Sequence, residues 1–221
     1  MNAKSIQATT PTLLEQELEM QLTEGFKPTL AIIFLSFHQD RKQVAEMFDS
    51  RNIAMYGATT DGEFIDEEII ENSISVLLLD IAKDQFHIYH DHFKDAPVRS
   101  LAQRFAKQSL ELFDKPKFLI LGSNLATDGE ALLRGYQDIL GFDVDVYGAM
   151  AGDGFLGGDS FVFSNGFDSE RGMVAIALDG DKVDIKGRAI CGWKPVGIER
   201  TVTKSEGNAL YEIDGITALE M

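Results

Sequence analysis

The stretch Tyr56-Gly57-Ala58-Thr59-Thr60-Asp61-Gly62-Glu63-Phe64 occurs twice in this chain, returning in altered form as Tyr147-Gly148-Ala149-Met150-Ala151-Gly152-Asp153-Gly154-Phe155. Each copy follows an apolar run, a helix-like segment and a second apolar run, and each precedes further strand-like runs. Such a block, repeated with its neighbours in the same order, indicates an internal duplication. We therefore expect two equivalent halves, with the paired glycine-containing loops as the functional centre.

The segments around the two copies also correspond. Apolar residues 30–35 match residues 117–122, and the helix-like residues 41–50 match residues 129–140. Downstream, residues 75–80 match residues 173–179. The apolar runs are continuous rather than alternating, which is typical of strands that are buried on both faces. The two repeats are therefore expected at about residues 30–94 and 117–191.

The order of these elements predicts an α/β fold with mixed sheets, made of two βαβ units that are each followed by a hairpin. Residues 74–81 and 86–93 fit such a hairpin, because the connection Ala82-Lys83-Asp84-Gln85 is short and polar. Strands outnumber helices, so a few helices could not cover both faces of one sheet. Two sheets packed face to face with helices outside, as α/β/β/α layers, would solve this; one long mixed sheet around the helices is the alternative.

Two further helices are expected outside the βαβ units. Thr10-Pro11 begins a segment that runs to Gly25 and repeats leucine every four residues, so residues 1–28 are expected to form a covering helix. Residues 97–113 should form an amphipathic helix that links the halves. Residues 144–147, 161–164, 173–178 and 183–191 read as strands, and residues 29–221 are expected to form one domain.

The composition limits the classes of partner. The chain has 36 acidic and 20 basic residues, a formal net charge of −16 and a pI near 4.5. Binding to nucleic acid or to an anionic membrane needs clustered Lys and Arg, so neither is expected. Cys191 is the single cysteine, which favours a reducing compartment. Because the sequence shows neither a signal peptide nor a membrane-spanning run, we expect the protein to be cytoplasmic.

The two loops and one helix start offer groups that could hold a small zwitterion. Glycine lets backbone N–H groups approach a ligand, and the start of the helix at residues 129–140 could bind a carboxylate. The loop carboxylates could bind an ammonium group. The alternative is that the glycines only make tight turns and that Thr127-Asp128-Gly129-Glu130 only caps the helix. The candidate ligand-binding residues are Gly57, Ala58, Thr59, Thr60, Asp61, Glu63, Ser123, Asn124, Thr127, Gly148, Ala149, Met150, Gly152 and Asp153.

Metal binding and catalysis are not expected. On a strand, His90 and His92 share one face while His87 points the other way, so at most two ligands meet, and a solvent-facing pair is favoured. No base lies near Cys191 in the sequence, which argues against a nucleophile. The sequence shows no proximity among the loop carboxylates, so we assign no catalytic residue and no cofactor.

Several of these segments resemble the amino-terminal module of the FIST family. They are Gly57 to Glu63 followed by Ser75-Val76-Leu77-Leu78-Leu79, Gly148 to Asp153, Gly192-Trp193-Lys194-Pro195-Val196-Gly197, and Leu210-Tyr211-Glu212-Ile213-Asp214-Gly215. The resemblance covers about residues 29–219. It implies an intracellular sensory domain of prokaryotic signalling proteins, which binds small ligands such as amino acids and passes the signal to an output domain or protein.

These observations predict a non-enzymatic ligand-sensing module, with a homodimer as one possible state. The family's carboxyl-terminal companion module, which usually follows Ala218-Leu219-Glu220, is expected to be missing. Two alternatives stay open. One is a protein-interaction scaffold without a small ligand, and the other is a hydrolase or transferase that uses the loop carboxylates.

Overall fold

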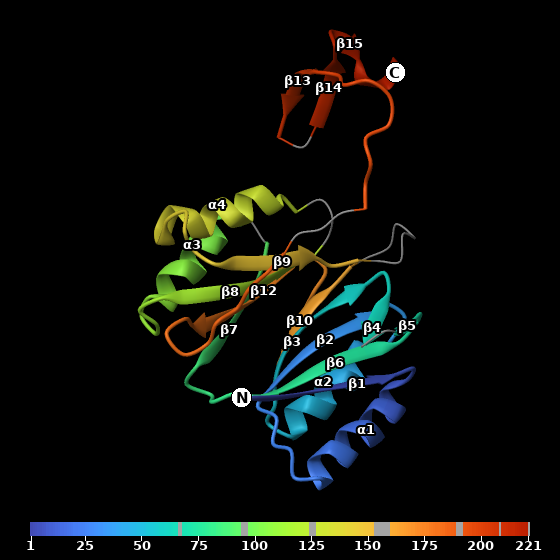
Figure 1. The fold of residues 1–221 in the computed structure, drawn as a ribbon, viewed down its shortest axis with the longest axis vertical. Coiled ribbons are helices and arrows are strands. Elements are labelled where there is room, and N and C mark those ends of the chain that lie inside the picture. The colour runs from blue at the N-terminus through green and yellow to red at the C-terminus, as the bar shows by residue number, and fades with distance from the viewer. Residues whose placement is uncertain are drawn as a thin grey trace. The chain divides into compact units, whose positions relative to one another are not determined.

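The computed structural model describes residues 1–65, 68–93, 97–123, 127–152, 160–188, 192–207 and 209–220. The chain divides into two compact units, Met1–Lys186 and Gly187–Met221. Figure 1 shows the helices and strands of each unit. Within the described residues, no helix combines the length and apolar character needed to cross a membrane.

The first unit contains two larger sheets, each with one parallel pair of strands. The first sheet has the order β1 (Asn2–Ala8), β6 (Ile74–Asp80), β2 (Leu30–Ser36), β3 (Ala54–Thr60), β10 (Val162–Ser164) and β11 (Phe167–Ser169). The second has the order β7 (Phe86–His92), β12 (Gly172–Asp179), β8 (Pro116–Gly122) and β9 (Val146–Met150). The pairs β2/β3 and β8/β9 are parallel, and their other neighbours are antiparallel. The expected mixed α/β fold is therefore confirmed.

Side chains cap three of the four α-helices in the described part of this unit. Helix α1 (Pro11–Thr23) starts after Thr10, whose hydroxyl accepts a hydrogen bond from Leu13 N. Helices α2 (Arg41–Ser50) and α4 (Gly129–Leu140) are capped by Asp40 and Asp128. Helix α3 covers Val98–Ser109, so the helix expected over residues 97–113 ends one turn early.

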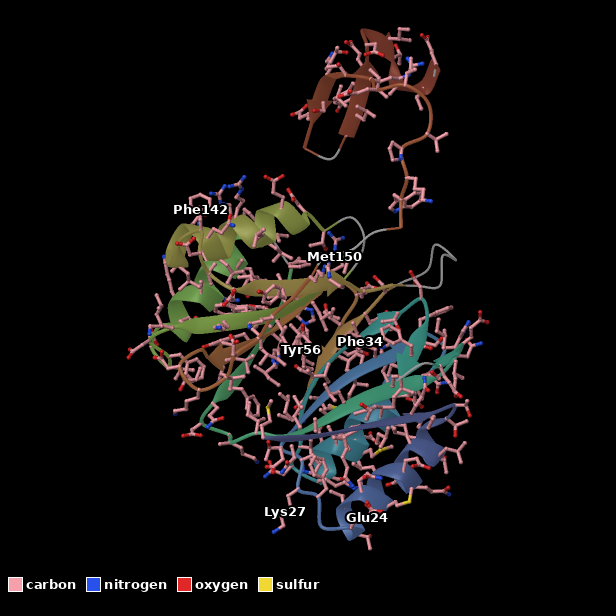
Figure 2. All side chains as sticks on the ribbon, viewed as in Figure 1. Glu24, Lys27, Phe34, Tyr56, Phe142 and Met150 are labelled. Carbon is pink, nitrogen blue, oxygen red and sulfur yellow. The ribbon has the colours of Figure 1, made fainter. Side chains whose placement is uncertain are left out.

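Three clusters of buried side chains hold the first unit together. One joins α1 and α2 to the first sheet, and another joins α3 and α4 to the second sheet. The third draws side chains from both sheets, such as Tyr56 of β3 and Ile176 of β12. Figure 2 shows Tyr56 in the region between the two sheets. Burial of these apolar surfaces is the main favourable contribution to folding.

The expected duplication appears in the strand order and in the register. The order β1-β6-β2-β3 in the first sheet corresponds to β7-β12-β8-β9 in the second. Tyr56 pairs with Ile32 of the parallel neighbour, and Tyr147 pairs with Leu119 at the corresponding position. The equivalent elements begin at β1 and at β7, so each repeat starts earlier than the expected residues 30 and 117. The strand β1 was not expected from the polar sequence of the first ten residues.

The hairpin expected for residues 74–81 and 86–93 is wrong. Strand β6 pairs with β1 and β2 in the first sheet, whereas β7 pairs with β12 in the second. The short connection between them therefore crosses from one sheet to the other. Phe86 and Ile88 of β7 contribute to the core shared by both sheets. Burial of this apolar face, rather than the length of the turn, decides where the strand pairs.

The two short hairpins that come after the duplicated stretches occupy different positions. Strand β10 pairs with β3 and with β11, so this hairpin extends the first sheet. Strands β4 (Glu63–Ile65) and β5 (Glu68–Ile70) pair only with each other among the described residues. The two halves thus share their main strands and helices, but they diverge after β3 and β9.

The second unit has a sheet of its own, β13 (Val202–Glu206), β14 (Ala209–Ile213) and β15 (Ile216–Thr217), followed by a short 3-10 helix at Ala218–Glu220. The strand expected at residues 183–191 is wrong for residues 183–188, which form none. Residues 189–191, including Cys191, lie outside the described residues.

Tyr136 offers a test of the core beneath α3 and α4. Its hydroxyl is buried and has no hydrogen-bond partner in the described part of the chain, and burial raises its pKa well above the usual range. Because an unsatisfied buried hydroxyl costs about 1–3 kcal/mol, Tyr136→Phe should raise the free energy of unfolding by about 1 kcal/mol. Urea denaturation measures this change, and a clear loss of stability would show that the hydroxyl has a bound partner.

Candidate functional site

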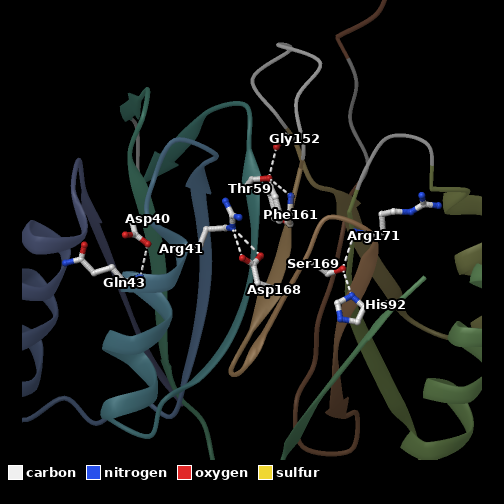
Figure 3. Close-up of polar contacts among 10 residues, drawn as sticks. All are labelled: Asp40, Arg41, Gln43, Thr59, His92, Gly152, Phe161, Asp168, Ser169 and Arg171. Atoms are coloured by element: carbon white, nitrogen blue, oxygen red, sulfur yellow. Dashed lines mark hydrogen bonds and ion pairs between the residues drawn. The ribbon is translucent and has the colours of Figure 1, made fainter. Parts of the chain in front are cut away.

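The ends of the two duplicated stretches meet at one edge of the sheets. Gly152 N donates to Thr59 O at 2.9 Å, and Thr59 Oγ1 donates to Gly152 O at 2.7 Å. Figure 3 shows this contact together with Phe161, which precedes β10. The expectation that the two glycine-containing segments lie together is therefore confirmed for these residues.

Thr59 anchors this junction from a fully buried position. Its N–H donates to Phe161 O at 2.9 Å, and its hydroxyl accepts from Phe161 N at 2.9 Å. The same hydroxyl donates to Gly152 O, so its hydrogen is used within the protein. Thr59 therefore joins the first half, the second half and the strand β10, rather than presenting its hydroxyl to a ligand.

The Asp61 carboxylate lies directly against the backbone of Gly152. A Cβ atom at Gly152 would come within 2.6 Å of Asp61 Cγ, which is far inside van der Waals contact. Glycine is therefore required at residue 152 for the carboxylate to approach this closely. The contact brings an acidic side chain of the first copy to the loop of the second copy.

Arg41 adds a positive charge beside the junction. It is the first residue of α2, and its guanidinium lies 3.6 Å from the centroid of the Phe161 ring. Arg41 Nε lies 3.2 Å from both carboxylate oxygens of Asp168, as Figure 3 shows. Stacking on an aromatic face and pairing with a carboxylate are both typical contacts of arginine. These contacts fix the guanidinium next to the loops.

An open hollow of about 700 Å³ adjoins this cluster. It is lined by His92, Phe93, Phe161, Asp168, Ser169, Glu170 and Arg171. Phe161 and Asp168 belong to both the hollow and the junction, so the two are continuous. The lining combines carboxylates, a guanidinium and aromatic rings. Such a mixture suits a small molecule that has both charged and apolar parts.

Glu63 is buried and bound within the protein instead of facing this hollow. It is 2% exposed, and its two carboxylate oxygens accept from Thr60 Oγ1 at 2.7 Å and from Ser73 N at 3.0 Å. The carboxylate thus fastens β4 to the segment that precedes β6. Thr60 is engaged in the same contact. Neither side chain is positioned to hold an ammonium group without breaking these bonds.

Ser123 and Thr127 also make internal hydrogen bonds. Ser123 Oγ accepts from Gly172 N at 2.7 Å and donates to Gly172 O at 3.1 Å, which fixes the end of β8 to β12. Thr127 Oγ1 donates to Ser123 O. The capping residue of α4 is Asp128, whose Oδ1 accepts from Ala131 N at 2.9 Å. The capping box was therefore placed one residue too early.

The Gly-Ala residues of each copy lie inside a strand, so their placement in a loop is wrong. Gly57 and Ala58 are buried in β3, where they pair with residues of β10, and Gly148 and Ala149 lie in β9. Met150 Sδ would lie 2.7 Å from a Cβ atom at Gly122, so this side chain packs near the start of α4. Asn124 and Asp153 lie outside the described residues.

Two serine–histidine pairs, which the sequence did not reveal, connect the two sheets. His90 Nδ1 lies 2.7 Å from Ser164 Oγ, and His92 Nδ1 lies 2.8 Å from Ser169 Oγ. Both imidazoles contact the Phe167 ring, with centroid distances of 4.5 and 4.8 Å. The expectation that His90 and His92 lie on one face of a strand is thus confirmed, but this face contacts β10 and β11 as well as solvent. Burial lowers the pKa of His90.

These pairs are poorly placed for nucleophilic catalysis. A serine nucleophile needs a base within hydrogen-bond reach, which both histidines provide, but its oxygen must also be accessible to the substrate. Ser164 and Ser169 are both buried. Ser169 Oγ also accepts from Arg171 N at 3.1 Å, as Figure 3 shows. The pairs therefore serve to join β7 to the hairpin β10–β11.

Comparison with protein-family models gives a match to the FIST N domain over residues 29–216. The matched region includes most of the first unit and nearly all of the second. A comparison with curated protein sequences found no match.

Proposed function

The chain belongs to the FIST N domain family, whose members are sensory domains of signal transduction proteins, and on this premise we propose that it binds a small ligand. The ligand that we propose is an amino acid or a related amine. The binding site is the hollow beside Thr59, Asp61 and Gly152. The signal passes to an output domain or protein in the cytoplasm, without a catalytic step.

One observation carries this proposal: groups of opposite charge surround the hollow where the two halves meet. Glu170 can hold an ammonium group and Arg171 a carboxylate, whereas Asp168 is already paired with Arg41. Charge-assisted hydrogen bonds to such groups are stronger than neutral ones. Because the hollow adjoins a junction between both halves, a bound ligand would also stabilise their contact.

A thermal-shift panel of amino acids and small amines tests this function. A ligand that binds only the folded state stabilises it by about 2.7 kcal/mol at a hundredfold its dissociation constant. Glu170→Gln, which removes a carboxylate charge from the lining of the hollow, should weaken amine binding by about tenfold, because a charge-assisted bond is lost. Asp143→Asn is the matched control, because Asp143 is exposed and lies before β9.

The proposal fails if no amino acid or amine shifts the unfolding midpoint at millimolar concentration. It also fails if Glu170→Gln and Asp143→Asn bind a discovered amine equally well and neither differs from the unaltered protein. Each variant is compared with its own ligand-free midpoint, so that a change in stability is not mistaken for a change in affinity.

A protein-interaction scaffold is the second candidate, and the hairpin β4–β5 favours it. Phe64 and Ile69 on this hairpin are 72% and 76% exposed. Exposed apolar side chains that lie close together are common at protein–protein contacts. The scaffold would be supported instead if no ligand of the panel shifts the unfolding midpoint and if Phe64→Ser abolishes the binding of a protein partner.

A further inference from the structure

A second cavity lies at the opposite end of β3 from the junction of the two loops. It has a volume of about 460 Å³ and is formed by three segments of the first unit. These are the turn from α2 into β3, the connection from β6 into β7 with β7 itself, and the turn between β10 and β11. A cavity of this size is large enough to enclose a small organic molecule.

Lys83 provides a positive charge at this cavity. Its Nζ donates to the backbone oxygen of Asn52 at 3.3 Å, and no carboxylate of the described residues pairs with it. The ammonium therefore keeps hydrogen-bonding capacity for an anionic group.

The imidazole of His90 lines the same cavity. His90 Nδ1 is hydrogen-bonded to Ser164 Oγ, and when the hydroxyl donates to Nδ1 the ring hydrogen lies on Nε2. His87 also belongs to the lining, but its ring packs beside Tyr89, with a centroid distance of 4.5 Å, on the other face of β7. Burial lowers the pKa of His90, so at neutral pH this ring is mainly neutral and offers one N–H donor.

The wall around these donors is held in place by Asn165. Its Oδ1 accepts from Met55 N at 2.6 Å, and its Nδ2 donates to Ile53 O at 3.0 Å. Nδ2 also donates to Asp49 Oδ1, so the carboxylate on the lining is already engaged. Asn52 has a φ of 56°, a left-handed conformation that asparagine adopts more readily than most residues. The cavity is therefore preformed.

Apolar side chains complete the cavity. Ile53, Ala54, Phe86 and Ile88 lie on its lining beside the polar groups. Phe86 and Ile88 also belong to the core shared by the two sheets, so this wall is firmly packed. An apolar wall next to the Lys83 ammonium and the His90 N–H matches a molecule with an apolar body and one anionic end.

We propose that this cavity binds a small organic carboxylate, whose anionic end accepts hydrogen bonds from Lys83 and His90 and whose body contacts Phe86 and Ile53. The site is separate from the hollow beside the loops, and it does not depend on the ligand proposed there. Because it joins α2, β7 and the hairpin β10–β11, occupancy stabilises contacts between elements of both halves.

Benzoate and benzamide test the proposal as a matched pair, because they share a ring and differ in charge. The chain has four histidines, so the imidazole signals in NMR spectra are few. Benzoate should shift the signals of His90 more than those of His87, whose ring lies on the other face of β7, and should leave those of His38 in place. Benzamide should shift them at least about tenfold less at equal concentration, since a charge-assisted bond is lost.

Lys83→Met should reduce the affinity for benzoate by about tenfold or more. Lys42→Met removes the same charge from an exposed position on α2 and should bind as the unaltered protein does. Unchanged His38 signals would show that each variant is folded. The proposal is overturned if benzoate produces no shift at tens of millimolar, if benzamide acts equally, or if both variants bind alike.

Discussion

Gly57→Ala is expected to lower the free energy of unfolding by about 2–3 kcal/mol, the upper part of the range for overpacking a core. A Cβ atom at residue 57 would lie 2.6 Å from Ile33 O and would also collide with the Phe163 ring. Ile33 O is a backbone atom of β2, and this strand cannot move away because it pairs with a strand on each side. Relief would require shifts in β3 and β10 together. Urea denaturation with a constant m value measures the loss.

Gly62→Ala is the matched control, because nothing lies within 4 Å of a Cβ atom there. Its stability should stay within about 0.5 kcal/mol of the unaltered protein, as for most surface substitutions. Gly148→Ala tests whether the second half repeats the constraint. A Cβ atom at Gly148 would lie 2.6 Å from Ile120 Cγ1 and still closer to Ile120 O. Equal stability of Gly57→Ala and Gly62→Ala would contradict the close strand packing.

The duplication could be predicted because its constraint is local. Gly57 and Gly148 each lie beside a backbone carbonyl of the neighbouring parallel strand, Ile33 O and Ile120 O. Because a side chain does not fit at either position, glycine occurs in both copies, and the repeated Tyr-Gly-Ala can be recognised in the sequence. The element order around it then predicts the α/β class and the two βαβ units.

The sheet that β7 joins could not be predicted from a local sequence pattern of this kind. A short polar connection such as residues 82–85 permits a hairpin, but it also permits a crossing between two packed sheets. The outcome depends on which apolar faces remain to be covered after folding. Phe86 and Ile88 fill part of the core between the two sheets, and only the three-dimensional structure shows that this core requires them.

The candidate site was only partly predictable for a related reason. The equivalence of the two copies predicted that their ends lie together, and Thr59 and Gly152 do so. Which polar groups remain available there depends on long-range partners. Ser123 is occupied by Gly172, and the partner of His90 is Ser164, 74 residues away. A single sequence does not identify partners at such separations.

Glu63→Ala is expected to lower the free energy of unfolding by about 2–4 kcal/mol, because a buried group left unpaired costs about 1–3 kcal/mol. The Glu63 carboxylate accepts from Ser73 N at 3.0 Å and from Thr60 Oγ1 at 2.7 Å. Alanine would leave the buried Ser73 N–H without a partner and would open a cavity beneath β4. The strand β4 and the start of β6 would then lose their common attachment.

Glu63→Gln separates hydrogen bonding from packing at this position. The glutamine carbonyl can still accept from Ser73 N, and its amide can donate to the Thr60 hydroxyl, so the loss should be about 1 kcal/mol. Glu68→Ala, on the exposed neighbouring strand β5, should change stability by less than about 0.5 kcal/mol. The ranking of these three variants in urea denaturation decides the role of Glu63. If Glu63→Ala loses no more stability than Glu68→Ala, the carboxylate does not hold β4, and its place in the ligand site has to be reconsidered.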